Sequence, residues 1–531
     1  MLAEDQSVGA FSDTPPWLVD PDDLLWRKGL HRVRAITRAE VPQLTRRHLV
    51  PPGARVVGVG AVLGRALAGW YVGERRSGDA AASRAGLSRR LRLAFERLGP
   101  TYIKLGQILS SGEGIFPEEL VREFRLLRDK VPAEPFDVVK RTVELDLGRP
   151  LDEVFSRFET TPVAAASIAQ VHAATLTTGE DVVVKVQRPT VASAVRRNLA
   201  AMSWIAPVLV GRIPVSALAN PPALVELFAE TIVEELDFRL EAENMLDVAR
   251  ILAETDQRMI VVPRPHPTLV TPRVLVMERL DGFSFDDVEG MHAAGIDTSA
   301  VVRAGMVAFL EGAILFGVFH GDLHGGNLFV LPDGRVALLD YGITGRLDEP
   351  RRLAFLRLMM TGTVNDVRGQ LAALRDLGAL PADVDIPQLM VDIGVDGPVK
   401  DPTQMSPDEL MGEIREIVKK LLGHGAKMPK ELMLFIKNML FLDGALATLA
   451  PDVDLFAEIS HIAVYFSQQH GARIASETGI DPRHQRVDLD GMRASMGLTP
   501  EVQSITHREL QERRQLIRKR MEDHRRSRKR R

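Results

Sequence analysis

The chain has 531 residues, of which 45% are apolar and 26% are charged, and its formal net charge is −4. These proportions are typical of globular domains and exclude global disorder. The length predicts three or four structural units. The chain contains no cysteine, which excludes disulfide bonds, thiolate catalysis and cysteine-ligated zinc.

Positive charge is concentrated at the C-terminal end. Residues 513–531 hold eleven Lys and Arg against two acidic residues, so the remaining residues carry a net charge of −13. Such an acidic body is a poor match for duplex DNA, and we expect no nucleic-acid partner. The basic tail has three interpretations: a solvated end, a segment attracted to anionic lipid, or an RNA-binding segment. The third is the least favoured, because base-stacking aromatic residues are lacking.

Two observations bear on location. The first 25 residues are acidic and lack a positive region before an apolar core, so they do not resemble a secretory signal. The apolar stretch 56–72 has 17 residues and is interrupted by Arg65, whereas a bilayer span needs about 20 apolar residues. We therefore expect a cytoplasmic protein without a transmembrane span, in which this stretch is a packed or interfacial helix.

The pattern of apolar residues changes along the chain. The first 50 residues show little periodicity, and we expect them to be loosely structured. Helical spacing dominates from residue 87 to about residue 148. β-Branched alternation then indicates two strands joined by a turn at 177–180, a helix at 222–252 and a second strand pair near 259–277. Beyond residue 281 the chain is mostly helical to about residue 468.

These changes predict five segments and an α+β fold with two lobes. The segments are a partly helical N-terminal extension (1–86), a helical segment (87–160), a strand-rich segment (161–280), a second helical segment (281–468) and a C-terminal segment with the basic tail (469–531).

The most informative cluster is His320-Gly-Asp-Leu-His-Gly-Gly-Asn327, followed by Val336-Ala-Leu-Leu-Asp-Tyr-Gly342. Two short strands separated by a Pro-Asp-Gly turn form a predicted hairpin, with Asn327 before it and Asp340 at its end. An Asp, an Asn five residues later and an Asp thirteen residues beyond are what phosphoryl transfer requires. Asp322 would orient the attacking group, and Asn327 and Asp340 would bind Mg²⁺. The spacing matches the protein-kinase catalytic loop and D-F-G motif, with Tyr341 in place of Phe.

Lys185 interrupts the apolar strand Val182–Val186 and alternates onto the face opposite Val184. A lysine there is costly unless it is paired with phosphate or carboxylate. An edge lysine that reaches solvent is the alternative. Because the Asp–Asn–Asp set lies downstream, we expect Lys185 to contact the phosphates of ATP.

The loop before this strand is rich in alanine where a kinase has glycine. It contains Ala164, Ala165, Ala166 and Ser167. Alanine restricts the backbone, so we expect a stiffer loop than a glycine cover, although alanine-rich segments more often form helices.

The chain resembles the UbiB/AarF/ADCK family of atypical protein-kinase-like proteins over residues 87–465. The motifs that carry the resemblance are Lys104-Leu-Gly-Gln107 (KxGQ), Ala164-Ala-Ala-Ser-Ile-Ala-Gln-Val-His172, Glu235-Leu-Asp237 (ExD), and the two segments around Asp322 and Asp340. The resemblance implies a two-lobed kinase-like fold, with an N-lobe at 161–280 and a C-lobe at 281–468. It also implies that the KxGQ helix packs over the active site.

The resemblance also implies roles for individual residues. Lys104 and Gln107, on one helical face, would restrict the site, with Glu235 as the partner of Lys104. We place Glu235, Asp237 and Glu241 on one helix and assign Glu241 to Lys185, although the two glutamates could be exchanged.

The remaining assignments concern the adenine and the catalytic loop. Met277, Glu278 and Leu280 resemble the hinge that meets adenine, and the alanine loop, including Ser167, would lie near the phosphates. His320 and His324 would buttress the catalytic loop.

This sequence departs from the family at several positions. Leu323 and Gly325 stand where prolines are common, Ala169 replaces a frequent glycine, and residues 114–117 are altered. These changes put loop geometry and turnover rate in doubt, but they remove no chemical group that binds nucleotide or metal.

By resemblance, the protein would be an ATP-binding, Mg²⁺-dependent atypical kinase or ATPase in isoprenoid quinone or related lipid biosynthesis. It would act peripherally at the inner face of the membrane, through an apolar segment or the basic tail. Its partners would be ATP and an isoprenoid lipid or lipid-biosynthesis protein. A Ser/Thr protein kinase, a nucleotide-binding pseudokinase scaffold and a small-molecule kinase are the alternatives. The client, the phosphate acceptor and the oligomeric state stay open.

Overall fold

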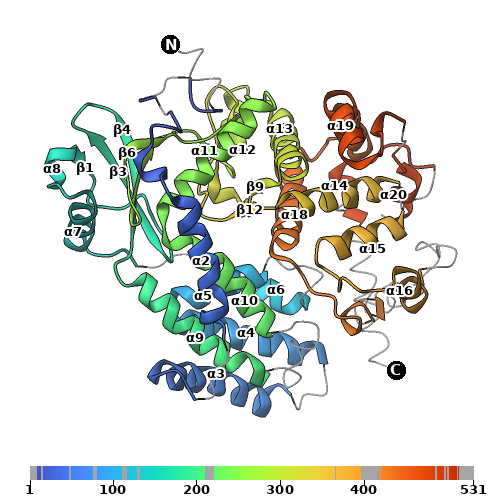
Figure 1. The fold of residues 1–531 in the computed structure, drawn as a ribbon, viewed down its shortest axis with the longest axis horizontal. Coiled ribbons are helices and arrows are strands. Elements are labelled where there is room, and N and C mark those ends of the chain that lie inside the picture. The colour runs from blue at the N-terminus through green and yellow to red at the C-terminus, as the bar shows by residue number, and fades with distance from the viewer. Residues whose placement is uncertain are drawn as a thin grey trace. The chain divides into compact units, whose positions relative to one another are not determined.

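In the computed structural model the chain divides into two units (Figure 1). Unit 1 comprises residues 1–254, 261–281 and 337–344, and unit 2 comprises residues 255–260, 282–336 and 345–531. The structure describes residues 9–13, 16–18, 20–46, 50–75, 80–110, 117–127, 132–209, 221–364, 366–395, 416–417, 420–484, 487–495, 498, 501–510 and 512–513. The altered stretch at 114–116 and all but Arg513 of the basic tail lie outside these residues.

Unit 1 contains a sheet in the order β1-β3-β4-β7-β6, with β2 paired to β3. Its strands are β1 (Phe155–Phe158), β2 (Ala164–Ala165), β3 (Ala169–Leu176), β4 (Asp181–Gln187), β6 (Pro265–Val270) and β7 (Val274–Glu278). The neighbouring strands are antiparallel. Both predicted hairpins, β3–β4 and β6–β7, are therefore confirmed.

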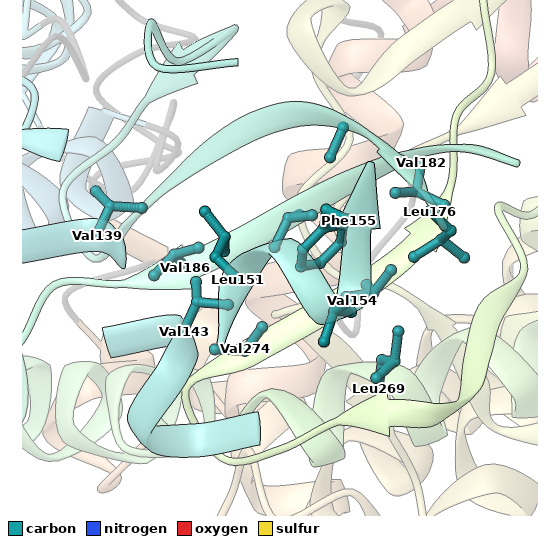
Figure 2. Close-up of a cluster of buried hydrophobic side chains, with 13 residues drawn as sticks. Val139, Val143, Leu151, Val154, Phe155, Leu176, Val182, Val186, Leu269 and Val274 are labelled. Carbon is teal, nitrogen blue, oxygen red and sulfur yellow. The ribbon is translucent and has the colours of Figure 1, made fainter. Parts of the chain in front are cut away.

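The alternation of β4 divides the sheet into an apolar and a polar face. Val182, Val184 and Val186 are at most 2% exposed and belong to a hydrophobic core that continues into α7 (Phe136–Leu147) and α8 (Leu151–Val154) (Figure 2). Lys185 lies on the other face, because successive side chains of a strand point in opposite directions. One face is thus sealed by valine and leucine, and the other is free for polar chemistry.

A group of helices in unit 1 packs together as a helical layer (Figure 1). They are α3 (Ala54–Gly73), α4 (Ala80–Leu98), α5 (Pro100–Ser110), α6 (Glu118–Phe124), α9 (Val191–Leu209) and α10 (Pro221–Ile232). A further helix, α11 (Phe238–Glu254), packs against β6 and β7. The predicted boundary at residue 86/87 falls inside α4, because the apolar period of that helix begins earlier than the sequence suggested.

The expectation of a loosely structured N-terminal stretch is wrong for its described residues. Ala10 exchanges backbone hydrogen bonds with Ala249 and Val262 (both 2.9 Å), and the Trp17 indole donates to the Pro265 carbonyl (3.0 Å). A short η1 (Leu25–Arg27) and the fifteen-residue α2 (Leu30–Leu44) follow. These contacts join residues more than 200 positions apart, so local periodicity could not reveal them.

Unit 2 is mainly helical. Its main elements are β8 (Phe283–Ser284), α12 (Val288–Ala293), α13 (Thr298–Glu311), the π-helical η4 (Gly312–Phe316), β9 (Val318–His320), η5 (Gly325–Asn327), β10 (Leu328–Val330), α14 (Glu349–Thr363), α15 (Val367–Asp376), α16 (Ile386–Ile393), α18 (Lys430–Leu449), α19 (Leu455–Thr478), η7 (Pro482–His484) and α20 (Leu489–Ser495). Three further strands, β5 (Ile260–Val261), β11 (Val336–Leu338) and β12 (Thr344–Arg346), lie where the chain passes between the units.

An aromatic cluster forms part of the core of unit 2. The Phe309 and Phe435 rings are stacked with centroids 5.3 Å apart, and Phe355 meets Phe435 edge-on at 4.7 Å. The predicted boundary at residue 468/469 falls inside α19, which continues to Thr478.

Among the residues that the structure describes, three helical stretches are long and apolar enough to cross a membrane by length and composition alone: Ala54–Gly73, Thr298–Phe316 and Lys430–Leu449. The most apolar window of each is 17%, 50% and 44% buried, respectively. Only the first of these is expected from the sequence as an apolar helix of this kind.

Burial of His266 predicts an acid-sensitive unit 1. Its Nδ1 accepts from the backbone N–H groups of Thr268 and Leu269 (both 3.1 Å), and burial lowers the pKa of His266 to about 4. An unfolded histidine has a pKa near 6.5. The unfolded state therefore binds a proton first, and stability present above pH 6.5 is lost progressively as the pH falls toward 4.

We expect the free energy of unfolding of wild type to fall by up to about 3 kcal/mol between pH 6.5 and 4 because of His266, and His266→Gln to abolish this contribution. Tryptophan fluorescence during urea unfolding is the readout, because all four tryptophans lie in unit 1. The exposed His31 supplies the control variant, His31→Gln. Equal pH slopes for wild type and His266→Gln would contradict the prediction.

Candidate nucleotide and metal site

The polar face of the unit 1 sheet holds a cluster of one lysine and two carboxylates. The Lys185 ammonium lies 2.7 Å from Glu241 Oε1 and 3.1 Å from Asp340 Oδ1. The side chains of Lys185 and Glu241 are 12% and 4% exposed, whereas that of Asp340 is 49% exposed. The cluster therefore combines a buried Lys185–Glu241 ion pair with a solvent-accessible Asp340 carboxylate. The pairing of Lys185 with Glu241 is the one the sequence analysis preferred.

The charges in this cluster control one another. Burial raises the pKa of Glu241 to about 7, against the opposing charge of Lys185. The protein around Asp340 partly desolvates its carboxylate, which would raise its pKa, but the positive charges of Lys185 and Lys104 and the Gly342 N–H hold that pKa at about 2. The Lys185 pKa is raised because the two carboxylates outweigh its desolvation. Asp340 is thus an ionised oxygen donor at neutral pH.

The backbone fixes the direction of the Asp340 carboxylate. Asp340 has a φ of 56°, in the left-handed region, a conformation that costs a non-glycine residue about 1–2 kcal/mol. Its Oδ1 accepts from the Gly342 N–H (3.1 Å), and a Cβ at Gly342 would lie 3.1 Å from the same oxygen. Glycine at position 342 therefore permits the turn that presents Asp340.

Asn244, one helical turn beyond Glu241 on α11, holds the neighbouring backbone. Its Nδ2 donates to the Tyr341 carbonyl (2.9 Å), and its Oδ1 accepts from Arg34 of α2 (3.1 Å). Arg34 also pairs with Glu243 (2.8 Å). Asn244 had no predicted role, because its partner Arg34 lies 210 positions away in the sequence.

The KxGQ residues share the partly exposed face of α5. Lys104, Gln107 and Ser110 are partly exposed, and the residues between them are buried. The Lys104 ammonium lies 3.3 Å from Glu235 Oε1, and these side chains are 14% and 11% exposed. The predicted pairing of Lys104 with Glu235 is therefore present, and the same lysine lowers the pKa of Asp340.

Glu235, Asp237 and Glu241 do not lie on one helix. Glu235 is in the 3₁₀ turn η3 (Glu234–Leu236), Asp237 is extended, and α11 begins at Phe238. The Asp237 carboxylate accepts from the Arg239 N–H (3.1 Å). Because aspartate competes with the backbone for such bonds, it favours a helix start over a helix interior. This break lets the two glutamates reach different lysines.

The alanine loop is a strand and a tight turn, not a helix. Ala164 and Ala165 form β2 opposite Val171 and Gln170 of β3. The Ala166 N–H donates to the Ala169 carbonyl (2.8 Å). Ala164, Ala165 and Ala166 are exposed or partly exposed, whereas Ser167 is 4% exposed.

Arg188, which the sequence analysis did not single out, holds this loop. Its guanidinium donates to the Ala166 carbonyl (3.0 Å), the Pro132 carbonyl (2.9 Å) and Glu134 (2.9 Å). The expected stiffness of the loop thus has a second cause besides its alanines.

The predicted hinge begins where expected. β7 ends at Glu278, and Met277 pairs with Val183 of β4. The Glu278 side chain accepts from Ser12 and from the Arg264 N–H (3.2 Å). Its own N–H donates to the Arg264 carbonyl (2.9 Å). An adenine contact at Glu278 would therefore use its carbonyl oxygen.

Unit 2 holds Asp322 and Asn327, which the sequence predicts to form a catalytic loop. The Asn327 side-chain amide donates to the Asp322 carbonyl (3.0 Å). His320 Nδ1 accepts from the Asp322 N–H and His324 Nδ1 from the Gly326 N–H, both at 3.1 Å. The two histidines thus buttress the loop as expected.

The donor set fits a magnesium ion that arrives with a nucleotide. Among the described residues, no cluster of three or more His, Asp or Glu side chains could hold a metal by itself. Mg²⁺ commonly takes one or two carboxylates together with substrate phosphates. The open, ionised Asp340 carboxylate of unit 1 suits this mode.

Comparison with known proteins identifies the family. A family model described as the ABC1 atypical kinase-like domain matches residues 126–373. The chain is 32% identical over 385 residues to a probable protein kinase UbiB of Aliivibrio fischeri, covering 70% of this chain and 69% of the relative. The chain belongs to the UbiB/AarF family of ABC1 atypical kinase-like proteins. This confirms the resemblance and the mixed α and β, kinase-like fold class.

Other members are similar over comparable lengths. An uncharacterised protein of Mycobacterium tuberculosis is 35% identical over 406 residues, 72% of this chain and 79% of that protein. The chloroplastic protein ACTIVITY OF BC1 COMPLEX KINASE 1 of Arabidopsis thaliana is 33% identical over 70% of this chain and 54% of its own length. A solved M. tuberculosis protein in complex with erythromycin has 23% identity and a TM-score of 0.37, over 65% of this chain and 91% of that one.

The Lys104–Glu235 ion pair is expected to contribute to the stability of unit 1. Lys104→Met leaves a largely buried carboxylate without its cation, which costs about 3–5 kcal/mol in comparable pairs. Adding Glu235→Gln should recover much of this loss, because the orphaned charge is removed. Urea unfolding followed by tryptophan fluorescence measures the double-mutant cycle.

The exposed pair Lys140–Glu144 (3.8 Å) is the matched control. Its disruption by Lys140→Met should cost no more than about 1 kcal/mol. Additive effects of Lys104→Met and Glu235→Gln would rule out the coupling.

Proposed function

We propose that the protein is an ATP-binding, Mg²⁺-dependent atypical kinase or ATPase. The observation that carries the proposal is the buried Lys185–Glu241 pair beside the open, ionised carboxylate of Asp340. Phosphoryl transfer depends on this combination of a lysine for phosphate oxygens and a carboxylate for the metal. Family membership supports the same reading.

The chain's own residues divide the work of binding. Lys185, oriented by Glu241, contacts the α- and β-phosphates of ATP. The turn at Ala164–Ser167 lies along the phosphates, and Met277, Glu278 and Leu280 meet the adenine. Asp340 and Asn327 provide the oxygen ligands, and bound Mg²⁺ supplies charge neutralisation at the phosphate oxygens.

Asp322 acts on the nucleophile. It orients the attacking hydroxyl or water and accepts its proton as the new oxygen–phosphorus bond forms. The bond between the γ-phosphorus and the bridging oxygen breaks, and ADP leaves with that electron pair. With water as the acceptor, the products are ADP, phosphate and a proton.

The KxGQ helix favours a small acceptor over a protein. Lys104 and Gln107 occupy the accessible face of α5, and the charge of Lys104 reaches Asp340. A cation and an amide at this position take up room that a peptide substrate would need. This supports an ATPase or small-molecule kinase more than a Ser/Thr protein kinase.

We further propose that the protein acts in isoprenoid quinone or related lipid metabolism at a membrane surface. Two features of unit 1 support an apolar client. A cavity of about 140 Å³ is lined, apart from Tyr102, by hydrocarbon and thioether side chains of the helical layer, including Leu105 and Leu109 of the KxGQ helix. Val57, Tyr71 and Val72 of α3 are at least 50% exposed. The basic tail would add attraction to anionic lipid.

Turnover of ATP tests the catalytic proposal. Wild type with Mg²⁺ should hydrolyse ATP, and anionic liposomes should raise the rate. Asp340→Asn should lower kcat about 100-fold or more, since metal-mediated charge stabilisation is worth several kcal/mol. Phosphate release by purified protein is the measurement.

Asp333→Asn is the control, because Asp333 is an exposed residue of a turn and pairs only locally with Arg335 (2.7 Å). Nucleotide binding without turnover under any condition would favour the pseudokinase scaffold. Transfer of labelled phosphate to a protein client would favour the protein kinase.

Lipid composition tests the proposed pathway. Cells that carry Asp340→Asn should have altered quinone or polyprenyl pools, because the proposed client lipid is no longer processed. Extraction and quantification of these lipids, beside cells that carry Asp333→Asn, is the measurement. Unchanged pools in the Asp340→Asn strain would count against the lipid role. They would not bear on the proposal that the protein turns over ATP, which is tested separately.

A further inference from the structure

The segment around Asp322 is held by two consecutive residues of α18. Asn438 is fully buried. Its side-chain oxygen accepts from the Leu323 N–H (3.0 Å), and its amide donates to the His320 carbonyl. These bonds fix the backbone on both sides of Asp322. The adjacent Lys437 donates from its ammonium to Asp322 Oδ1.

This pair is unusual for its surroundings. α18 is one of the most apolar helices of the chain, with Leu, Met and Phe on either side of Lys437 and Asn438. A polar pair in such a helix is costly unless its groups are bonded. Here both side chains are bonded to the segment around Asp322, and these bonds offset the free-energy cost of placing polar groups in an apolar helix.

We propose that Lys437 is the positioning residue of Asp322, with Asn438 fixing the backbone beneath it. The inference rests on the proposed function, because it concerns the carboxylate that would accept the proton of the nucleophile. The ion pair selects one orientation of that carboxylate. A displacement of about 1 Å at a reacting group can cost about 100-fold in rate.

The ammonium charge has a second effect that packing could not supply. Without a nearby cation, the Asp322 carboxylate repels the negative charge that develops on the attacking oxygen in the transition state, because like charges at close range interact strongly outside bulk water. Lys437 offsets this repulsion at Asp322 itself, so its loss is expected to lower kcat and to leave ATP binding largely unchanged. The role therefore requires a cation, and an isosteric neutral side chain cannot perform it.

The lack of cysteine in the chain allows this requirement to be tested at one atom. Lys437→Cys introduces a single thiol, and the position is accessible because Lys437 is 19% exposed. Alkylation with 2-bromoethylamine rebuilds a side chain of the same length as lysine, with its ammonium. Methyl methanethiosulfonate gives a neutral adduct instead. Lys427→Cys, at an exposed lysine outside α18, is the matched control for both reagents.

We expect Lys437→Cys and Lys437→Met to lower kcat about 100-fold while the KM for ATP changes less than about twofold. The ammonium adduct should regain at least about tenfold in kcat, and the neutral adduct should regain nothing. Equal recovery with both adducts, an unchanged kcat, or a loss confined to KM would overturn the proposal.

Hydrogen exchange separates this inference from the proposed function. If wild type shows no turnover, the proposed function fails. The positioning role still predicts faster exchange of the amides at 321–327 in Lys437→Met than in wild type or Lys427→Met. Unchanged exchange there would overturn the positioning role regardless of turnover.

Discussion

The buried ammonium group of Lys185 is the constraint on which unit 1 depends. A strand whose other face belongs to the valine core can carry this lysine only if carboxylates meet it. Glu241 must therefore lie in the first turn of α11, and the chain must turn at Asp340 in a left-handed conformation to bring the second carboxylate. The ion pairs with Lys185 offset the free-energy cost of burying the Glu241 carboxylate and of the left-handed conformation at Asp340.

α11 coordinates more than the lysine. Glu241 reaches the sheet, Asn244 holds the backbone after Asp340, and Glu243 and Asn244 bind Arg34 of the N-terminal α2. The helix is interrupted at Asp237, so that Glu235 pairs with Lys104 and Glu241 pairs with Lys185. One helix thus links the N-terminal segment, the sheet and the Asp340 turn.

The features that depend on residues close together in the sequence could be predicted from the sequence. The alternation of β4, both hairpins and the placement of Lys104 and Gln107 on one face follow from periodicity. The two lysine–glutamate pairs were expected from the family resemblance, which left the two glutamates exchangeable. The break at Asp237 was missed, because an aspartate within an acidic run looks the same inside a helix as at its start.

Other features depend on partners far away in the sequence. Residues 9–13 and α2 contact residues more than 190 positions later. Arg188 resembles an ordinary basic residue at a strand end until Ala166 and Pro132 surround it. Lys437 and Asn438 lie 115 or more residues from the groups that they bind. No window of sequence contains both members of such pairs.

The three long apolar helical stretches are not equivalent as membrane segments. α13 carries Arg303 and the fully buried Glu311, which is bonded to Tyr465 and His470 (both 2.7 Å). α18 carries Lys437. A charged residue at mid-helix costs about 2.5–3.5 kcal/mol on insertion, and each of these groups already has a protein partner. The three apolar stretches found among the described residues have similar hydropathy, but two of them carry charged groups that are already bonded to other parts of the folded protein.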